Sequence, residues 1–399
     1  MSSVSQPPAS RPRARDLGVR IGLMPTGATN SIVDVADVSV GHRTIWRDEP
    51  GPPSGRGTAR TGVPAIVPFG SAELFARRVP AGAAVLNGAG EAIGITTIQE
   101  WGVIESPIML TSSMAIGRVY DAVIADLVER IPKVGIDDAV LPVVAECDDG
   151  VLNASRVVQV DAGDVEAAID GAVGSVRGTP DLGVVGAGTG MVCFELKGGI
   201  GTASRVVRPL GRDGSAPGRA ADAYRVGVLA LTNFGWLERL TIDGVRVGQA
   251  LVDDGWPVAG GGTAEADLRV TPRERGSCVV VVATDAPLLP HQLERLARRA
   301  GLGLARTGST AGHGSGEIFL AFSTGYRIER DPPAATTVTT HVTDSYLDRF
   351  FMAAVEATEE AVIDSLFVAD SVTGRDGFVV PGLPVDRALG LLRTAGRLA

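Results

Sequence analysis

The residues Ser277-Cys-Val-Val-Val-Val-Ala-Thr-Asp-Ala-Pro-Leu-Leu-Pro290 form a largely β-branched run that ends in proline. An uninterrupted run of this kind is typical of a central strand buried on both faces, and the prolines indicate a turn behind it. The stretch before it, residues 253–276, is polar and includes Gly260-Gly-Gly262. Loops of over about twenty residues are uncommon inside a compact domain and are usually functional or disordered. The sequence therefore predicts a flexible loop over 252–276 and a boundary between Gly276 and Ser277.

Strand-like and helical patterns alternate along the rest of the chain. Residues 30–41 alternate between apolar and polar, which predicts a strand with one buried face after an N-terminal tail over 1–29. The residues Thr111-Ser112-Ser113 are candidate helix caps. This interleaving predicts an α/β or α+β protein with at least one well-covered sheet. Helices are expected at 114–131, 165–176, 291–300 and 345–365, and strands at 140–144, 182–185, 225–231 and 278–283.

Composition and charge exclude several classes of protein. The chain has 399 residues, 45% apolar and 21% charged, and can bury one large core or two ordinary ones. A net charge of −9, without clustered cations beyond the N-terminal tail, argues against nucleic acid as a partner. No apolar run approaches the ~18 residues of a membrane span. The N-terminus lacks the apolar core of a secretory signal, and the three cysteines indicate neither a disulfide framework nor a zinc site, so we expect a cytoplasmic protein.

Common catalytic templates do not fit the sequence. No serine lies in G-x-S-x-G, and around Ser315 the glycine positions hold His313 and Glu317. The four histidines form no H-E-x-x-H zinc motif. The cluster Gly186-Ala-Gly-Thr-Gly190 follows a predicted strand, but Met191 stands where a dinucleotide-binding fingerprint needs its last glycine. We interpret the cluster as a turn with a close backbone approach. His313 is either a locally bonded loop residue or part of a site.

The boundary at Ser277 suggests a different kind of hydrolase. Cleavage before Ser277 would free its α-amine, whose usual pKa of about 7.7–8.0 suits a base for the hydroxyl of the same residue without any histidine. Gly276 has no Cβ and tolerates the strained backbone that attack on its carbonyl requires. A second serine and a glutamate follow at Ser315 and Glu317. The alternative is an ordinary junction between a loop and a strand.

Several blocks of the sequence resemble one known family. On these blocks the chain is similar to the L-aminopeptidase/D-amidase-esterase family of self-processing serine aminopeptidases, which includes the β-peptidyl aminopeptidases. The resemblance extends over nearly the whole chain from residue 30. The blocks include Asn87-Gly-Ala-Gly-Glu91, Lys197-Gly-Gly-Ile-Gly-Thr-Ala-Ser204, Asn233-Phe-Gly235, 276–288, 314–317 and Glu356-Ala-Thr-Glu-Glu360.

The resemblance implies roles for individual residues. After Glu146 the family usually has a threonine and then an aromatic residue that lines the substrate pocket, whereas this chain has Cys147-Asp148. We expect the anionic Asp148 to change the shape and charge of that pocket. The roles implied are self-cleavage between Gly276 and Ser277, nucleophilic attack by Ser277, proton handling by Ser315 and Glu317, oxyanion binding by Asn233, and binding of the substrate's amino group by Glu146.

The resemblance also implies a fold and an activity. The fold is a four-layer αββα sandwich, shared with the ornithine acetyltransferases, in which 30–276 and 277–399 become two chains of one domain. The activity is release of N-terminal residues from short peptides, amides or esters through an acyl-enzyme, without metal or organic cofactor, by a homo-oligomer that is commonly a tetramer. Acyl transfer on the same fold is one alternative, although the acetyltransferases use threonine at the position of Ser277. A non-catalytic homologue with an uncut chain is another.

Overall fold

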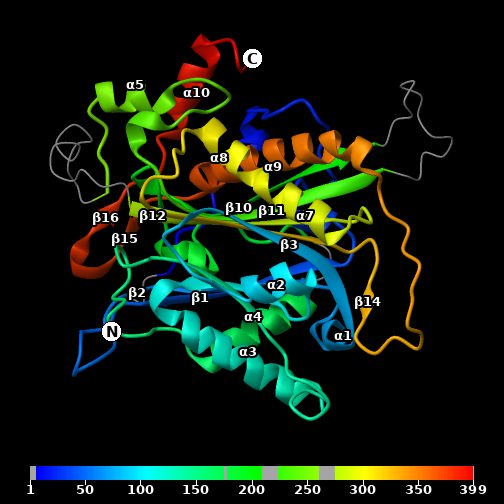
Figure 1. The fold of residues 1–399 in the computed structure, drawn as a ribbon. Coiled ribbons are helices and arrows are strands. Elements are labelled where there is room, and N and C mark those ends of the chain that lie inside the picture. Colours follow the sequence, from blue (N-terminus) through cyan, green and yellow to red (C-terminus); the bar gives the residue numbers. More distant parts are fainter. Residues whose placement is uncertain (1–5, 175–177, 209–222, 260–274, 399) are drawn as a thin grey trace.

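Two β-sheets lie face to face between two layers of helices in the computed structural model (Figure 1). The structure describes residues 6–174, 178–208, 223–259 and 275–398. Of the loop predicted over 252–276, residues 260–274 lie outside the described residues. At its ends the prediction is wrong, because helix α5 (Val247–Asp253) continues to residue 253 and strand β12 already begins at Arg275. The layers make this an α+β protein with the αββα arrangement that the resemblance implies.

The larger sheet is mixed and contains the predicted central strand. Strand β12 runs antiparallel to β11 and parallel to β13, so it has a partner on each side, as its β-branched sequence predicts. The order of the strands is β10 (Gly199–Val207), β11 (Tyr224–Asn233), β12 (Arg275–Thr284), β13 (Gly314–Ser323), β3 (Arg77–Gly88) and β14 (Ile328–Glu329), with β5 (Val103–Ile104) also paired to β3.

The smaller sheet faces the larger one and is also mixed, because β6 and β7 pair in parallel. Two short hairpins lie outside both sheets, one formed by β8 (Val192–Cys193) and β9 (Leu196–Lys197), the other by β15 (Val372–Thr373) and β16 (Val379–Val380). The order of the strands in the smaller sheet is β1 (Val38–Arg47), β2 (Ala59–Pro68), β6 (Ile108–Ser112), β7 (Val143–Cys147) and β4 (Ala92–Ile93).

Helices cover the outer face of each sheet. Helices α7 (Pro290–Arg298), α8 (Ala300–Thr307) and α9 (Leu347–Val368) lie over the larger sheet, and α3 (Ile116–Arg130) and α4 (Ala162–Gly174) over the smaller one (Figure 1). No helix among the described residues is long and apolar enough to cross a membrane. The remaining helices are α1 (Ser71–Ala76), α2 (Ile95–Trp101), α5 (Val247–Asp253) and α10 (Val385–Thr394).

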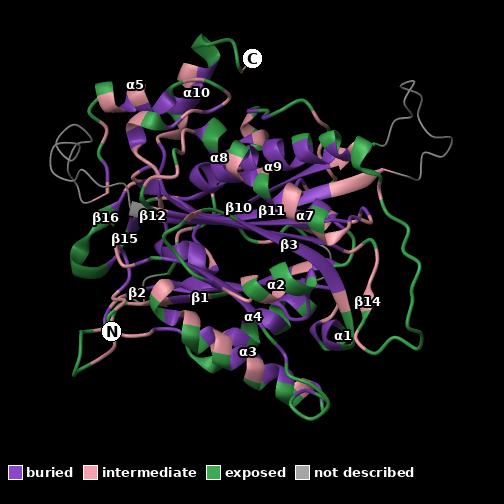
Figure 2. Ribbon diagram, viewed as in Figure 1, coloured by how far each residue is buried: buried purple, intermediate pink, exposed green. Residues whose placement is uncertain are grey.

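The side chains of β12 alternate between two cores. Val279 and Val281 pack into the core shared with the smaller sheet, whereas Cys278 and Val280 pack beneath the helices α7–α9. Figure 2 shows the central strands buried along their length. Because side chains of a strand point alternately to opposite faces, Ser277 shares the face of Val279. Its hydroxyl is thereby directed to the space between the sheets.

The N-terminal segment, predicted as a tail, runs antiparallel to α9 over residues 11–24 and joins a buried cluster of charges. Arg13 pairs with Asp364 at 2.6 Å, and Arg15 pairs with Glu360 at 2.8 Å. The fully buried Arg205 of β10 bridges Glu356 at 3.0 Å and Glu360 at 2.7 Å. We call this set the α9 ion network; its members are Arg13, Arg15, Arg205, Glu356, Glu360 and Asp364.

Most of the predicted elements are confirmed, with shifts at their ends. The helices predicted at 114–131, 165–176, 291–300 and 345–365 correspond to α3, α4, α7 and α9, and the strands at 225–231 and 278–283 to β11 and β12. The strand predicted at 140–144 begins three residues later, as β7, and the one predicted from residue 30 begins at Val38, after a 3-10 turn at Ile32–Asp34. The strand predicted at 182–185 is wrong, because Gly183 has a left-handed φ of 75° and forms only an isolated bridge with Ile200.

Candidate functional site

The end of β11 lies beside the start of β12, and this brings together Asn233 and Ser277, the proposed oxyanion donor and nucleophile. Asn233 is the last residue of β11 and pairs directly with Ser277 on β12. On its other side Ser277 pairs with Gly316 of β13. Three strands thus fix the backbone of Ser277, whose side chain points toward the smaller sheet.

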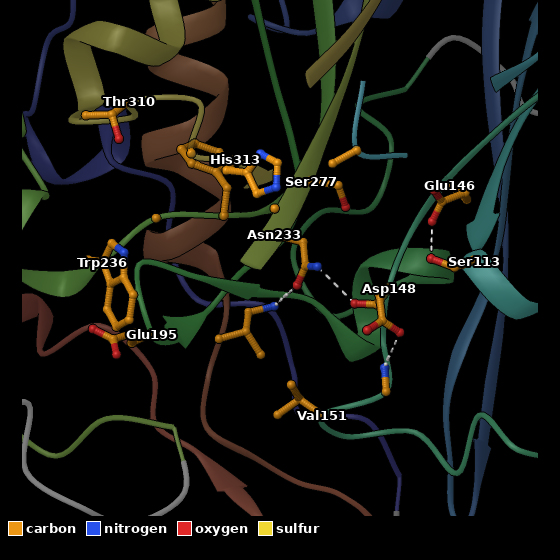
Figure 3. A pocket seen from close by; sticks show the side chains of 18 of the residues that line it. Ser113, Glu146, Asp148, Val151, Glu195, Asn233, Trp236, Ser277, Thr310 and His313 are labelled. Atoms are coloured by element: carbon orange, nitrogen blue, oxygen red, sulfur yellow. Dashed lines mark hydrogen bonds between the residues drawn. The ribbon is translucent and has the colours of Figure 1, made fainter. Parts of the chain in front are cut away.

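A cavity of about 1160 Å³ opens at this junction. Ser277 lines it but is only 4% exposed, and its hydroxyl oxygen has no hydrogen-bond partner among the described residues. The buried Cys147 thiol lies beside this hydroxyl, and burial raises the pKa of that thiol. Figure 3 shows Ser277 and His313 in the middle of the view, with Glu146 and Ser113 on one side. A buried hydroxyl without a partner is unusual in a folded protein and is consistent with a reacting group.

Gly276 is held where no side chain fits. A Cβ added to it would lie 2.3 Å from the carbonyl oxygen of Asn233 and 2.9 Å from Cα of Phe234. These atoms belong to the backbone of β11 and its continuation and cannot move aside. The glycine before Ser277 is therefore required by a close approach of two strands, a reason that the sequence did not reveal.

Asn233 is oriented by two hydrogen bonds. Its Oδ1 accepts from the backbone N–H of Val192 at 2.9 Å, and its Nδ2 donates to the backbone oxygen of Asp148 at 2.9 Å (Figure 3). A primary amide nitrogen carries two hydrogens. The second hydrogen of Nδ2 can therefore donate to an oxygen bound next to Ser277 in the cavity.

Glu146 forms the acidic end of the cavity. It lies on β7, is 7% exposed, accepts from the backbone N–H of Glu91 at 2.9 Å and also accepts from the hydroxyl of Ser113. Burial raises the pKa of the Glu146 carboxyl, the two hydrogen bonds oppose this, and the charge of Asp148 adds to the rise. Asp148 is exposed in the cavity wall and accepts from the backbone N–H of Gly150 at 3.0 Å. The wall here carries two carboxylates with neutral donors around them.

Ser315 and Glu317 lie behind the cavity rather than in its wall. Both are fully buried, and the Ser315 hydroxyl donates to the Glu317 carboxylate. Glu317 pairs with Cys278 across β12 and β13, so strand alternation puts both side chains on the face turned to the helices α7–α9. The pair therefore cannot meet the Ser277 hydroxyl directly; it lies next to the backbone that leads into Ser277.

The structure brings the predicted site residues to one junction, in two groups. Gly276, Ser277, Asn233, Glu146 and Asp148 line the cavity, and Ser315 with Glu317 lies behind it. His313 also lines the cavity, which favours the interpretation of this histidine as part of a site over that of a locally bonded loop residue.

The sequence did not reveal the roles of two serines. Neither Ser112 nor Ser113 caps α3. Ser112 donates to the buried Asp149 at 2.8 Å, and Ser113 donates to Glu146. A run of hydroxyl residues before a helix predicts a helix cap. Here the hydroxyls instead donate to carboxylates from a distant part of the sequence, which local spacing does not reveal.

The described residues contain no group of three or more His, Cys, Asp or Glu side chains that could hold a metal ion. The polar groups of the cavity include several hydroxyls, the Asn233 amide, the His313 imidazole, carboxylates and the guanidinium groups of Arg239 and Arg375. This set suits nucleophilic attack on a carbonyl next to a cationic group of the substrate.

Comparisons with known proteins agree with this chemistry. The pattern of peptidase family S58 matches residues 30–380. A beta-peptidyl aminopeptidase of Sphingosinicella xenopeptidilytica is 41% identical over 384 residues, which cover 96% of this chain and 91% of that protein. Among solved structures, an L-aminopeptidase D-Ala-esterase/amidase of Ochrobactrum anthropi, described as a variant of the Ntn-hydrolase fold, has a TM-score of 0.84 at 37% identity and covers 98% and 100% of the two chains. A beta-aminopeptidase of a Burkholderia species has a TM-score of 0.80 at 39% identity, covering 96% and 99%.

Proposed function

The chain belongs to peptidase family S58 and is a serine aminopeptidase; we propose that it activates itself by cleavage between Gly276 and Ser277 and then uses Ser277 as its nucleophile. The observation that carries this proposal is the buried hydroxyl of Ser277, which lacks a partner among the described residues and lines the cavity opposite Asn233. Substrates are short peptides, amides or esters with a free amino terminus.

Self-cleavage begins with attack of Ser277 Oγ on the carbonyl carbon of Gly276. The C–N bond between the two residues breaks as the nitrogen takes up a proton, and an ester joins Gly276 to Oγ. This step already frees the α-amine of Ser277. Water then hydrolyses the ester, which frees the carboxylate of Gly276 and the hydroxyl of Ser277. The absent side chain at Gly276 supports this step, because the strands that confine the scissile bond leave room only for glycine.

Turnover uses the same hydroxyl, now next to its own α-amine. The amine takes the proton from Oγ as the hydroxyl attacks the substrate carbonyl, and later gives a proton to the leaving amine. Ser315 and Glu317 lie on the other face of the sheet, so we assign them to orienting the α-amine and exchanging protons with it rather than to contact with the hydroxyl. The second N–H of Asn233 Nδ2 donates to the oxyanion.

Glu146 and Asp148 bind the amino end of the substrate in this proposal. Loss of the substrate's ammonium group would leave a carboxylate without its cation in a partly desolvated pocket. N-acetylated substrates should then be hydrolysed at least ~100-fold more slowly than those with a free amine. Kinetics measured in parallel on Ala-p-nitroanilide and its N-acetyl derivative test whether Glu146 and Asp148 bind the substrate's ammonium group. Equal rates for the two substrates would refute this role.

Two further proposals concern the state of the protein in the cell. The three cysteines are free thiols, which supports a reducing compartment, and we propose the cytoplasm. We also propose that processed units assemble as homotetramers, as the resemblance implies. Sedimentation of the processed enzyme tests the assembly.

Intact-mass analysis of freshly purified active enzyme tests self-cleavage. In proportion to 276 and 123 of the 399 residues, the 41.1 kDa chain should yield fragments of about 28 and about 13 kDa. N-terminal sequencing of the smaller fragment should read Ser-Cys-Val-Val. Full activity in a single uncut chain would refute the proposal.

A further inference from the structure

Lys197 is a buried cation beneath the proposed oxyanion donor. It lies on β9 and is fully buried. Its Nζ donates to the backbone oxygens of Gly188 at 2.9 Å, Met191 at 2.8 Å and Gly198 at 2.7 Å. An ammonium group has three hydrogens, and these three bonds use all of them. In the part of the chain that the structure describes, Nζ of Lys197 contacts backbone carbonyl oxygens and no carboxylate.

Burial of such a group is costly, so its retention needs a reason. An ammonium without a counter-ion loses its hydration on burial, and burial lowers the pKa of Lys197 to about 7. A methionine of similar length would avoid this cost but would leave three buried carbonyl oxygens without a donor. The reason for a lysine at this position therefore lies in the three hydrogen bonds from Nζ to backbone carbonyl oxygens.

The segment around Lys197 is packed through its backbone. A Cβ at Gly188 would lie 2.5 Å from the oxygen of Gly183, and one at Gly190 would lie 2.4 Å from the oxygen of Arg60. A Cβ at Gly198 would lie 2.6 Å from Cβ of Cys193. Side chains cannot fill this space, so the position of the segment depends on what its carbonyl groups bind, and Nζ of Lys197 binds three of them.

One peptide group connects Lys197 to the site. The oxygen of Met191 accepts from Nζ of Lys197, and the N–H of the same peptide group, carried by Val192, donates to Oδ1 of Asn233. In a trans peptide the C=O and N–H point in opposite directions within the plane, so the ammonium lies at one edge of this peptide group and the Asn233 amide at the opposite edge. Successive hydrogen bonds of this kind polarise one another, which makes the Nδ2 hydrogens of Asn233 stronger donors.

We propose that Lys197 is a positioning residue for the reaction: through the Met191–Val192 peptide its Nζ holds the Asn233 amide in the orientation that presents Nδ2 to the oxyanion. This inference rests on the proposed function, specifically on the oxyanion role of Asn233. A purely structural lysine would stabilise the segment without affecting the reaction of folded protein.

The test is a double-mutant cycle between Lys197→Met and Asn233→Ala. Alone, Lys197→Met should lower both the rate of self-cleavage and kcat per processed site by ~10²-fold, as expected for a disabled oxyanion donor, with KM changed less than about threefold. In the Asn233→Ala background, Lys197→Met should have less than about threefold further effect, because its route to the reaction is already removed. Rates are normalised to the processed, folded fraction by intact mass and an active-site burst.

The matched control is Gln292→Met, which removes a buried amide that donates to the backbone oxygen of Val342 at 2.8 Å. It should leave kcat per site within twofold of the parent. If Lys197→Met does not fold, Lys197→Gln, which keeps one amide donor without the charge, takes its place in the same cycle.

Two outcomes overturn the inference. A Lys197 variant with kcat per site within threefold of the parent shows a structural role only, and so does a loss that simply adds to that of Asn233→Ala. A different result separates this failure from failure of the proposed function: if Asn233→Ala itself retains the activity of the parent, the oxyanion assignment is wrong, and the inference about Lys197 falls with it.

Discussion

The α9 ion network and the cavity at Ser277 are both buried and polar, yet their groups are paired differently. In the network each carboxylate meets at least one guanidinium: Glu360 accepts from Arg15 and Arg205, Glu356 from Arg205, and Asp364 from Arg13. In the cavity Glu146 accepts only from neutral donors in the described structure, and the hydroxyl of Ser277 has no partner there. The network holds the fold together, whereas the cavity keeps capacity for groups that a substrate brings.

The pKa of Glu360 follows the same division, although burial raises the pKa of Asp364 to about 6 in spite of its pairing with Arg13. Burial alone would raise the pKa of the Glu360 carboxyl, but the hydrogen bond from Arg15 and the charge of Arg205 lower it overall. Burial also raises the pKa of Glu146, and there the hydrogen bonds from neutral groups do not reverse the shift. A carboxylate that lacks a cation in the resting protein gains most from an arriving ammonium group.

The largest expected effect comes from removing the hydroxyl of Ser277. Ser277→Ala should leave the chain whole at 41.1 kDa and lower the hydrolysis of Ala-p-nitroanilide by ~10⁴-fold or more. Thermal stability should change little, because the neighbour of that hydroxyl in the described structure is the Cys147 thiol, which is at most a weak hydrogen-bond partner. Intact mass and thermal unfolding measure the two halves of this expectation. Normal cleavage in the variant would show that another residue attacks Gly276.

Removing Arg205 tests the stabilising role of the α9 ion network. Arg205→Met leaves Glu356 without its guanidinium, and breaking a buried ion pair in this way costs about 3–5 kcal/mol of the free energy of unfolding. Urea unfolding in the uncut Ser277→Ala chain measures this loss without dissociation of two fragments. In the processed enzyme kcat per site should stay within twofold. The control Arg298→Met breaks the exposed pair with Glu294 and should cost less than about 1 kcal/mol. Equal losses in the two variants would contradict the comparison.

Glu317→Gln sharpens the comparison, because Glu317 is buried like the network but is assigned to the reaction. The variant should slow self-cleavage and turnover by ~10²-fold, the usual loss for an acid–base group. The half-time of cleavage and kcat, measured on one preparation, decide the matter. Rates within twofold of the parent would place Glu317 with the structural groups.

The smallest effect concerns Asp148. The charge of Asp148 adds to the rise in the pKa of Glu146 that burial causes. In the proposed function both a neutral Ser277 α-amine and an ionised Glu146 are needed, so kcat/KM should first fall as the α-amine is protonated and then fall more steeply below the pKa of Glu146. Asp148→Asn removes a like charge and lowers this pKa, so the steeper part of the acidic limb should move to lower pH. An unmoved limb in kcat/KM against pH would show that the two carboxyl groups do not interact.

The identity of the residue at 148 should also affect substrate preference. We expect the parent to favour small or cationic N-terminal residues over bulky apolar ones, because the anionic Asp148 lies in the cavity wall, at a position where the resemblance implies an aromatic ring. Asp148→Tyr should reverse that ranking among Ala-, Leu- and Lys-p-nitroanilide. An identical ranking in both proteins would show that the side chain at 148 does not contact the substrate.

The sequence predicted the features that depend on local patterns. The β-branched run from Cys278 predicted a strand buried on both faces, which is β12. The helix predicted over 345–365 corresponds to α9. The resemblance located all the residues proposed for the site. Local patterns failed where distant segments meet: Gly183 ends a predicted strand in a left-handed turn, and Ser113 serves Glu146 on another strand instead of capping α3. The role of Lys197 depends on three carbonyl groups that a tight turn brings together, and no spacing in the sequence reveals it.

The order of the proposed cleavage parts along the chain has a consequence for biosynthesis. Ser277 is translated before β13, which carries Ser315 and Glu317 and is the parallel neighbour of β12. Under the proposed cleavage, the bond before Ser277 would therefore stay intact until β13 has been synthesised, because β13 carries the residues assigned to proton exchange. Helix α9 follows later still, and its contacts with residues 11–24 join the two ends of the translated chain. Under the proposed cleavage, the nascent polypeptide is cut only after the two future chains have folded around each other, so neither is released as an orphan fragment.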